Sequence, residues 1–272
     1  MKIGSRDFEI GKQTYIMGIL NVTPDSFSDG GKFQGVDHAL AQAETLIADG
    51  ADILDIGGES TRPGYTKIAD DEEIRRVTPV IEAIRKRFDI PLSIDTYKSA
   101  VAEAAILAGG NLINDIWGLK YDKNMAAVAK RLDAPVCLMH NRQEPVYADF
   151  MPDVLRDLQE SIQIAEAAGI NRDKLILDPG VGFAKSLEQN LEVIARLEAF
   201  RAFGLPVLLG TSRKSVIGRA LKLPVEEREE GTIATSVIGV MAGCDFIRVH
   251  DVKRNFRAIR MAEAIRTYRA GA

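Results

Sequence analysis

The chain has 272 residues, of which 46% are hydrophobic, and a formal net charge of −4 from 35 basic and 39 acidic side chains. That length suits one (β/α) barrel or two smaller domains. The balanced charge argues against a general nucleic-acid surface, and no apolar run approaches the roughly 18 residues of a membrane span. Because no cationic and then apolar leader opens the chain, we expect a soluble cytoplasmic protein. Cys137 and Cys244 lie in apolar runs, which predicts buried free thiols.

The N-terminal part is expected to form a hairpin at 7–12 that covers one end of the core. The first buried strand follows at 15–20, and the chain changes character at Asn21. Pro24 ends the strand, and the polar segment after it carries two carboxylates and Phe27. Phe27 either folds back on the core or belongs to a mobile loop that covers a polar ligand.

The switch from an apolar strand to a polar loop recurs along the chain. Further strands are expected at 52–56, 91–94, 112–113, 135–139, 175–177, 206–210 and 246–247. Helical patterns are expected at 36–49, from 70, and at 98–107, 126–131, 154–168, 187–203, 226–242 and 254–269. Eight such units without a linker predict an α/β fold, the (β/α)8 TIM barrel, with the hairpin capping its bottom. An open doubly wound sheet is the alternative, but no G-x-G-x-x-G follows the first strand.

Polar side chains gather where the strands end, which is the face that carries the chemistry of such barrels. A single Asp or Asn after a strand is more often a cap for the next helix, and Asp115 and Asp251 fit that role. A whole set on one rim instead predicts an active site. Its members are Asn21, Thr61, Asp95, Asn114, Asp178, Lys214, Arg248 and His250.

Three of these side chains suit a flat heterocycle. Asp95, Asn114 and Asp178 offer carboxylate and amide groups that can pair with ring N–H and carbonyl groups. Met139 and Phe183 are positioned to supply apolar walls. We therefore expect this rim to bind a planar ring edge-on.

The remaining rim residues suit an anion. Arg248 and His250 follow one strand at i and i+2 and so point the same way, and with Asn21 on the neighbouring strand they make a phosphate pocket. Asn21 can also offer an oxygen to Mg²⁺. Lys214 is either a donor to the ring or a solvated lysine at a helix start. His140 is as readily a supporting residue as a ligand.

Taken together, these motifs resemble the dihydropteroate synthases along nearly the whole chain. The matching stretches are 17–31 (MGILNVTPDSFSDGG), 55–64 (DIGGESTRPG), 93–96 (SIDT), 114–116 (NDI), 138–140 (LMH), 178–183 (DPGVGF), 210–215 (GTSRKS) and 248–250 (RVH). The first two stretches are highly specific, and no departure falls at the matched positions. The resemblance implies one pterin-binding domain over 1–272.

That family condenses 6-hydroxymethyl-7,8-dihydropterin pyrophosphate with p-aminobenzoate to give 7,8-dihydropteroate and pyrophosphate. The resemblance implies a pterin site made of Asp95, Asn114, Met139, Asp178, Phe183, Lys214 and Arg248. It implies phosphate binding by Asn21, Arg248 and His250, with Mg²⁺ at Asn21. It implies a p-aminobenzoate site made of Phe27, Thr61, Arg62, Pro63 and Ser215, with Lys214 beside it. The implied catalytic residues are Asn21, Asp25, Phe27, Lys214, Arg248 and His250, in a homodimer formed through the outer C-terminal helices.

The resemblance also implies how the reaction proceeds. The C–O bond to pyrophosphate ionises early, the cationic groups stabilise the leaving charge, and the loop with Asp25 and Phe27 closes over it. The neutral aromatic amine needs no strong base. Three alternatives stay open at this stage: a pterin-dependent methyltransferase, a pterin-binding paralogue without turnover, and an aldolase with a Schiff base on Lys214.

Overall fold

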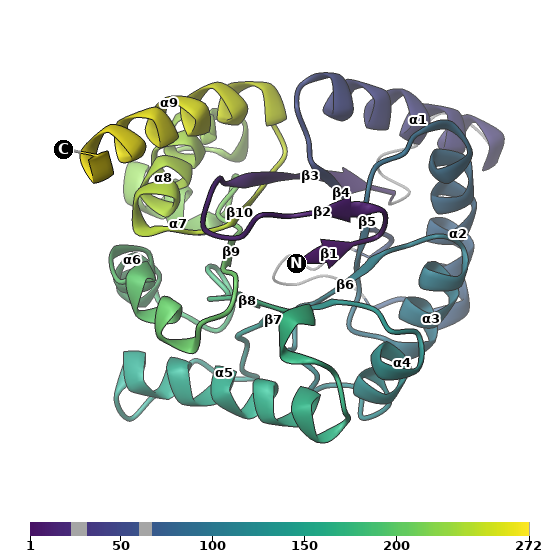
Figure 1. Cartoon of the computed structure of the whole chain (residues 1–272), viewed down its shortest axis with the longest axis horizontal. Coiled ribbons are helices and arrows are strands. Elements are labelled where there is room, and N and C mark those ends of the chain that lie inside the picture. Colours follow the sequence, from purple (N-terminus) through teal and green to yellow (C-terminus); the bar gives the residue numbers. More distant parts are fainter. Residues whose placement is uncertain (23–31, 60–66, 272) are drawn as a thin grey trace.

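The computed structural model describes residues 1–22, 32–59 and 67–271, and the side chains of these except 32–34 and 269–271. Eight parallel strands form one sheet in the order β8-β7-β6-β5-β4-β3-β10-β9. A bridge between Leu177 and Val207 links the two outer strands, so the sheet closes into the predicted (β/α)8 barrel (Figure 1). The strands are β3 (Tyr15–Asn21), β4 (Ile53–Gly57), β5 (Leu92–Asp95), β6 (Leu112–Asp115), β7 (Val136–Met139), β8 (Leu175–Asp178), β9 (Leu208–Leu209) and β10 (Phe246–Val249).

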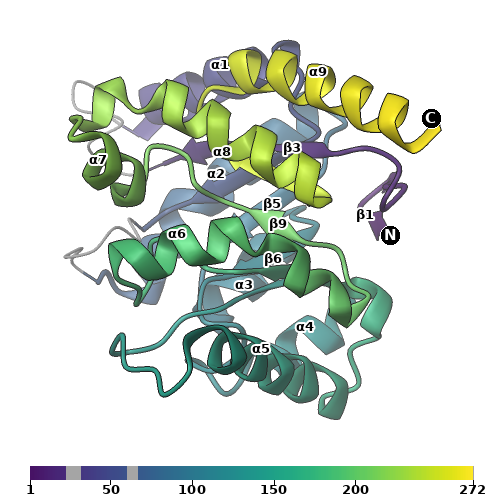
Figure 2. The same cartoon turned by 90° about the vertical axis from the view of Figure 1, so that its left-hand side faces the viewer.

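Helices surround the barrel on its outside (Figures 1 and 2). The α-helices are α1 (Lys32–Ala48), α2 (Asp70–Arg87), α3 (Ser99–Leu107), α4 (Met125–Arg131), α5 (Phe150–Ala167), α6 (Leu187–Ala195), α7 (Ser215–Leu221), α8 (Glu229–Ala242) and α9 (Val252–Gly271). Short 3-10 helices lie at Arg172–Lys174, Leu197–Phe203 and Val225–Glu227. Within the described ranges, none of the helices combines the length and apolar character needed to cross a membrane.

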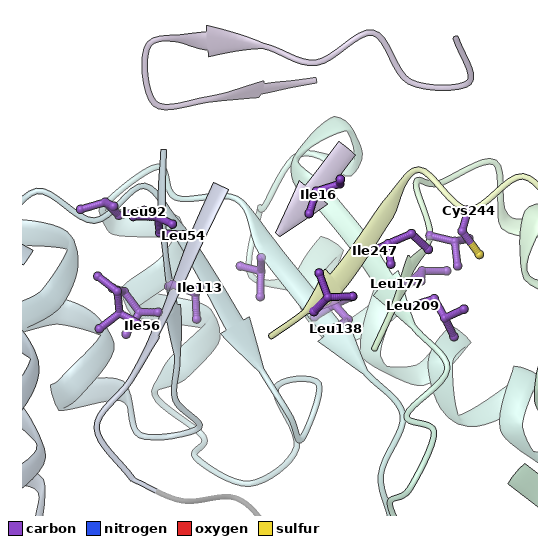
Figure 3. Packing of buried hydrophobic residues seen from close by; sticks show 14 of the residues in the cluster. Ile16, Leu54, Ile56, Leu92, Ile113, Leu138, Leu177, Leu209, Cys244 and Ile247 are labelled. Carbon is purple, nitrogen blue, oxygen red and sulfur yellow. The ribbon is translucent and has the colours of Figure 1, made fainter. Parts of the chain in front are cut away.

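Two apolar layers hold the barrel together. The larger layer lies between strands and helices, and Figure 3 shows Ile56, Ile113 and Leu209 among its members. Strand residues face both layers, which explains why the strands are continuous apolar runs rather than alternating ones. The smaller layer fills the barrel interior near the strand starts. Its members are Ile3, Phe8, Tyr15, Met17, Ile53, Leu112, Cys137, Ile176, Leu208 and Phe246. Cys137 and Cys244 are buried free thiols, as expected.

The N-terminal hairpin caps this inner layer, but it is formed by earlier residues than predicted. Its strands are β1 (Lys2–Ile3) and β2 (Arg6–Asp7), which lie across the start of the barrel strands (Figure 3). The turn falls at Gly4, whose φ of +60° suits glycine. Phe8 instead packs its ring 4.7 Å from that of Tyr15, because a large apolar side chain gains more from burial than from an exposed turn.

Four helix predictions differ from the structure. The expected helix at 187–203 breaks after Ala195, because the 3-10 helix that follows brings Leu197 and Phe200 to one buried face at a spacing of three residues. Helices α1 and α5 begin at Lys32 and Phe150, four residues before the predicted starts at 36 and 154, whereas α8 lies within the predicted range 226–242. Helix α7 was not expected, because it is short and contains Gly218.

Candidate active site

The carboxyl ends of β4, β5 and β6 bring three buried polar side chains together. Asp95 and Asn114 are partners in the parallel register of β5 and β6. Asn114 Nδ2 donates to Asp55 Oδ2 at 3.1 Å. All three side chains are more than nine-tenths buried. The predicted neighbours Asp95 and Asn114 therefore do meet, and Asp55 joins them from inside β4.

Arg248 completes this cluster from β10. Its Nε donates to Asp55 Oδ2 at 2.6 Å, and its Nη2 donates to Asp95 Oδ2 at 2.7 Å. Burial raises the pKa of Asp95 to about 7, although Arg248 opposes the shift. Burial alone would lower the pKa of Arg248, but the charges of Asp55 and Asp95 raise it above its usual value. The guanidinium therefore stays charged between its two carboxylates.

The same cluster contains two unsatisfied acceptors. Asp55 Oδ1 and Asp95 Oδ1 are buried and accept no hydrogen bond from any described residue. A buried carboxylate oxygen without a donor costs roughly 1–3 kcal/mol or more, so such atoms are uncommon in folded proteins. The cluster is therefore suited to a ligand that supplies N–H groups.

Asp178 and Lys214 form the opposite side of the rim. Lys214 Nζ donates to the carbonyl of Val181 at 2.6 Å and lies 4.8 Å from the centre of the Phe183 ring. Burial lowers the pKa of Lys214 to about 8 despite the nearby charge of Asp178, and burial also raises the pKa of Asp178. Lys214 is thus partly buried and donates to the chain beside the rim, and its role as a donor to the ring stays a prediction.

Gly210 lies close to both charged groups on this side of the rim. A Cβ atom on Gly210 would lie 3.7 Å from Lys214 Nζ and 3.8 Å from Asp178 Oδ2. Gly210 therefore lies between the two charged groups.

Apolar residues line the adjacent wall, as predicted. Met139 packs with Tyr97 and Ile116, and Phe183 lies against this group. Met139 is the register partner of Asp178, so the wall meets the polar rim directly.

Asn21 and His250 lie on neighbouring strand ends. β3 ends at Asn21 and pairs in parallel with β10, and β10 ends at Val249, just before His250. His250 Nδ1 is 2.9 Å from Ser212 Oγ, and the same oxygen accepts the His250 backbone N–H at 3.2 Å. Ser215 is exposed at the first residue of α7.

Several predicted residues are outside the described part of the chain, so their roles stay predictions. They are Asp25, Phe27, Thr61, Arg62 and Pro63. Among the described residues, no group of three or more His, Cys, Asp or Glu side chains could hold a metal ion. Asn21 lies at the end of β3 and offers a side-chain oxygen, and Mg²⁺ takes few protein ligands beside phosphates and water.

Some residues near the rim have a purely local role. Asp115 accepts the backbone N–H groups of Trp117 and Leu119 at 2.9 and 2.7 Å. Asp251 accepts the N–H of Arg254 at 3.0 Å in the first turn of α9. Asp251 therefore has the capping role expected for it, whereas the prediction for Asp115 is wrong: its carboxylate closes a turn after β6, and Asn124 holds the N-cap position of the next helix.

Two residues at the rim were missed by sequence reasoning. Asp55 is one acidic residue within an apolar strand. A strand that is buried on both faces leaves no solvent for such a side chain, so the sequence did indicate that Asp55 is buried and needs a partner. Lys185 is buried against His140, and nothing local marks it. His140 has a partner at each ring nitrogen, which makes it a supporting residue.

Comparison with known proteins agrees with this geometry. A family model described as pterin binding enzyme matches residues 17–250. A dihydropteroate synthase of Clostridium beijerinckii is 60% identical over 266 residues, which cover 97% of this chain and 99% of the relative.

Solved structures show the same likeness. One is a dihydropteroate synthase from Clostridium difficile determined in the presence of pteroic acid, with 53% identity, a TM-score of 0.93, and coverage of 95% of this chain and 99% of that one. Another is the Xanthomonas albilineans enzyme with 4-aminobenzoic acid, with 42% identity, a TM-score of 0.90, and coverage of 94% of each chain.

The fold and the rim define a (β/α)8 barrel whose strand ends carry buried polar groups, two of them with unsatisfied acceptors. The chain belongs to the pterin-binding enzymes, and among them to the dihydropteroate synthase family. The resemblance drawn from the motifs is confirmed, and the methyltransferase and aldolase alternatives lose their support.

Proposed function

We propose that this protein condenses 6-hydroxymethyl-7,8-dihydropterin pyrophosphate with p-aminobenzoate, forming 7,8-dihydropteroate and pyrophosphate. The observation that carries the proposal is the pair of buried acceptors, Asp55 Oδ1 and Asp95 Oδ1, inside a cluster that also holds Arg248. A pterin edge supplies ring and amino N–H donors of the kind that these oxygens lack.

Recognition of the pterin ring uses both sides of the rim. Asp95 and Asn114 face its donors and acceptors from one side, and Asp178 and Lys214 do so from the other. Phe183 and the Met139 wall exclude water from the ring faces, which strengthens each polar contact. This division follows from the strand order, because β5 and β6 lie apart from β8 and β9 in the sheet.

The bond changes are simple. The C–O bond between the pterin methylene and pyrophosphate breaks, and its electron pair leaves with pyrophosphate. The lone pair of the p-aminobenzoate nitrogen forms the new C–N bond, and the amine proton is released to solvent. Arg248, His250 and Asn21 lie where two neighbouring strands end, and they would stabilise the leaving charge by preorganised donors.

The proposal includes Mg²⁺, which Asn21 would hold together with the phosphate oxygens. Mg²⁺ usually keeps few protein ligands beside substrate phosphates and water, so we propose that the substrate supplies most of its ligands. When bound, the ion would neutralise phosphate charge as the C–O bond breaks. We expect chelation to abolish turnover and to leave binding of a plain pterin intact.

The p-aminobenzoate side of the proposal rests on family membership. It assigns Phe27, Thr61, Arg62 and Pro63, which the structure does not describe, and Ser215, which follows Lys214 at the start of α7. The first loop, with Asp25, would close over the pyrophosphate.

We also propose a homodimer in the cytoplasm. Support comes from large apolar side chains exposed on α8 and α9, namely Ile238 at 45%, Met261 at 62% and Ile265 at 42%. The two helices pack against each other, so these side chains belong to one region of the surface.

Pyrophosphate release tests the proposed function. Purified protein is mixed with the pterin pyrophosphate and Mg²⁺, with and without p-aminobenzoate, and release is followed by a coupled assay. We expect release that depends on all three components. Tight binding of the pterin without any release would instead identify the chain as a paralogue without turnover.

A further inference from the structure

Lys185 is a buried basic residue beside the site that the proposed reaction does not use, and burial lowers its pKa to about 7. Its Nζ lies 2.8 Å from His140 Nδ1, and it donates to the carbonyls of Gly180 and Phe183 at 2.9 and 3.1 Å. Three acceptors use all three N–H groups of an ammonium. The side chain is therefore saturated, and two of its partners belong to one loop, 180–184.

His140 is held in one tautomer by this arrangement. Its Nε2 lies 3.1 Å from Asp157 Oδ2, and Asp157 accepts two bonds from Arg142 at 2.6 and 3.1 Å. A carboxylate must accept and an ammonium must donate, so Nε2 carries the hydrogen and Nδ1 accepts from Lys185. Burial lowers the pKa of His140 to about 4, which agrees with a neutral ring. The donor and acceptor of each hydrogen bond from Arg142 through Asp157 and His140 to Lys185 are thus assigned without conflict.

The loop that Lys185 holds contains three residues with left-handed backbone conformations. Gly180, Gly182 and Ala184 have φ values of +69°, +87° and +43°. Glycine adopts this conformation freely, but it costs about 1–2 kcal/mol at Ala184, which has a Cβ, so there it persists only where the surroundings enforce it. Lys185 Nζ donates to the carbonyls of Gly180 and Phe183, and these two hydrogen bonds help to hold the loop in this conformation.

The same loop contacts the catalytic lysine. Lys214 Nζ donates to Val181 O at 2.6 Å and lies over the Phe183 ring. The Lys214 side chain also runs 3.1 Å from the position that a Cβ on Gly182 would take. The loop therefore sets both the aromatic wall and the place of the lysine donor.

From these contacts we propose that Lys185 is a positioning residue for pterin binding, acting through loop 180–184 on Phe183 and Lys214 and touching no substrate itself. This inference rests on the proposed function for the identity of the ligand. Displacement of a positioned donor by about 1 Å can cost roughly 100-fold in rate, so the expected effects are large for a residue outside the pocket.

The test is a double-mutant cycle with a binding readout. Lys185→Met, Phe183→Ala and the double variant are compared in their affinity for 6-hydroxymethylpterin, followed by pterin fluorescence, and in kcat/KM. Lys174→Met serves as control, because Lys174 donates to the carbonyl of Asp133 at 2.7 Å, before β8 begins and away from the rim. Thermal unfolding shows which variants are folded.

We expect Lys185→Met to weaken pterin binding about 10-fold or more and to lower kcat/KM by roughly 100-fold. On the Phe183→Ala background the further loss should be smaller than in the wild type, because the part that acts through Phe183 is already lost and only the part through Lys214 remains. Lys174→Met should bind pterin as the wild type does. If Lys185→Met does not fold, Lys185→Gln keeps two N–H donors, and we expect it to bind with intermediate affinity.

Wild-type affinity in Lys185→Met, or fully multiplicative losses in the double variant, would overturn the inference. The same holds if Lys185→Gln, measured in place of the methionine variant, binds as tightly as the wild type. Failure of the proposed function looks different, because then the wild-type protein itself would not bind pterin or would form no product.

Discussion

Arg248→Met removes the guanidinium that lies between Asp55 and Asp95. The two contacts measure 2.6 and 2.7 Å, and the carboxylate side chains are 0% and 7% exposed. Removing one partner of a buried ion pair typically costs about 3–5 kcal/mol, because an unpaired charge is left behind. We expect a loss of that size in the free energy of unfolding, measured by urea denaturation at pH 9.

The loss of unfolding free energy in Arg248→Met should become smaller as the pH falls. Burial already raises the pKa of Asp95 to about 7, and without Arg248 it rises further. A carboxyl whose pKa is raised in the folded protein takes up a proton as the pH falls, and its charge then no longer has to be buried. The destabilisation should therefore shrink from pH 9 to pH 6, by about 1.4 kcal/mol for each unit by which the variant raises this pKa.

Arg131→Met is the matched control. Arg131 pairs with Glu103 at 2.8 Å, but both side chains are on the surface, where such pairs contribute little. We expect no measurable change with pH in this variant. A loss of unfolding free energy as small in Arg248→Met as in the control would refute the assignment of Asp55 and Asp95 as a buried pair of carboxylates held by Arg248. A loss that grows as the pH falls would refute it as well.

Three further outcomes follow. Because burial lowers the pKa of Lys214 to about 8, kcat/KM for the pterin substrate should fall as the pH rises through that value, and a Lys214→Arg variant should have lower activity without that fall. Gly180→Ala places a Cβ 1.9 Å from the carbonyl oxygen of His140 and should cost about 3 kcal/mol or more. Gly204→Ala, at φ +64° with nothing within 4 Å, should cost only roughly 1–2 kcal/mol in the same unfolding assay. Asp25→Ala should reduce turnover far more than binding of a plain pterin, and equal losses would argue against loop closure.

The barrel could be predicted because each strand is a local signal. Runs such as 135–139 and 175–177 are apolar on both faces, and each ends at a polar residue. The same feature places Asp95, Asn114 and Asp178 on one rim without any knowledge of contacts, since parallel strands end at the same face.

The roles of Asp55 and Lys185 and the position of the hairpin could not be predicted, because they depend on contacts between residues far apart in the sequence. Asp55 is one acidic residue within a strand, and only Arg248, 193 residues away, explains how its charge is buried. Lys185 follows a glycine-rich turn and looks like any surface lysine until His140, 45 residues earlier, is placed beside it. The hairpin was misplaced for a related reason, because burial of Phe8 is decided by Tyr15 and Phe246 rather than by its neighbours.

The most direct test of the central claim is the mass of the product formed from the pterin pyrophosphate and p-aminobenzoate by the purified wild-type protein with Mg²⁺. The account predicts 7,8-dihydropteroate when both substrates are present and none when either is omitted. Tight pterin binding at the Asp95 and Asp178 rim with no dihydropteroate at any enzyme concentration would contradict it.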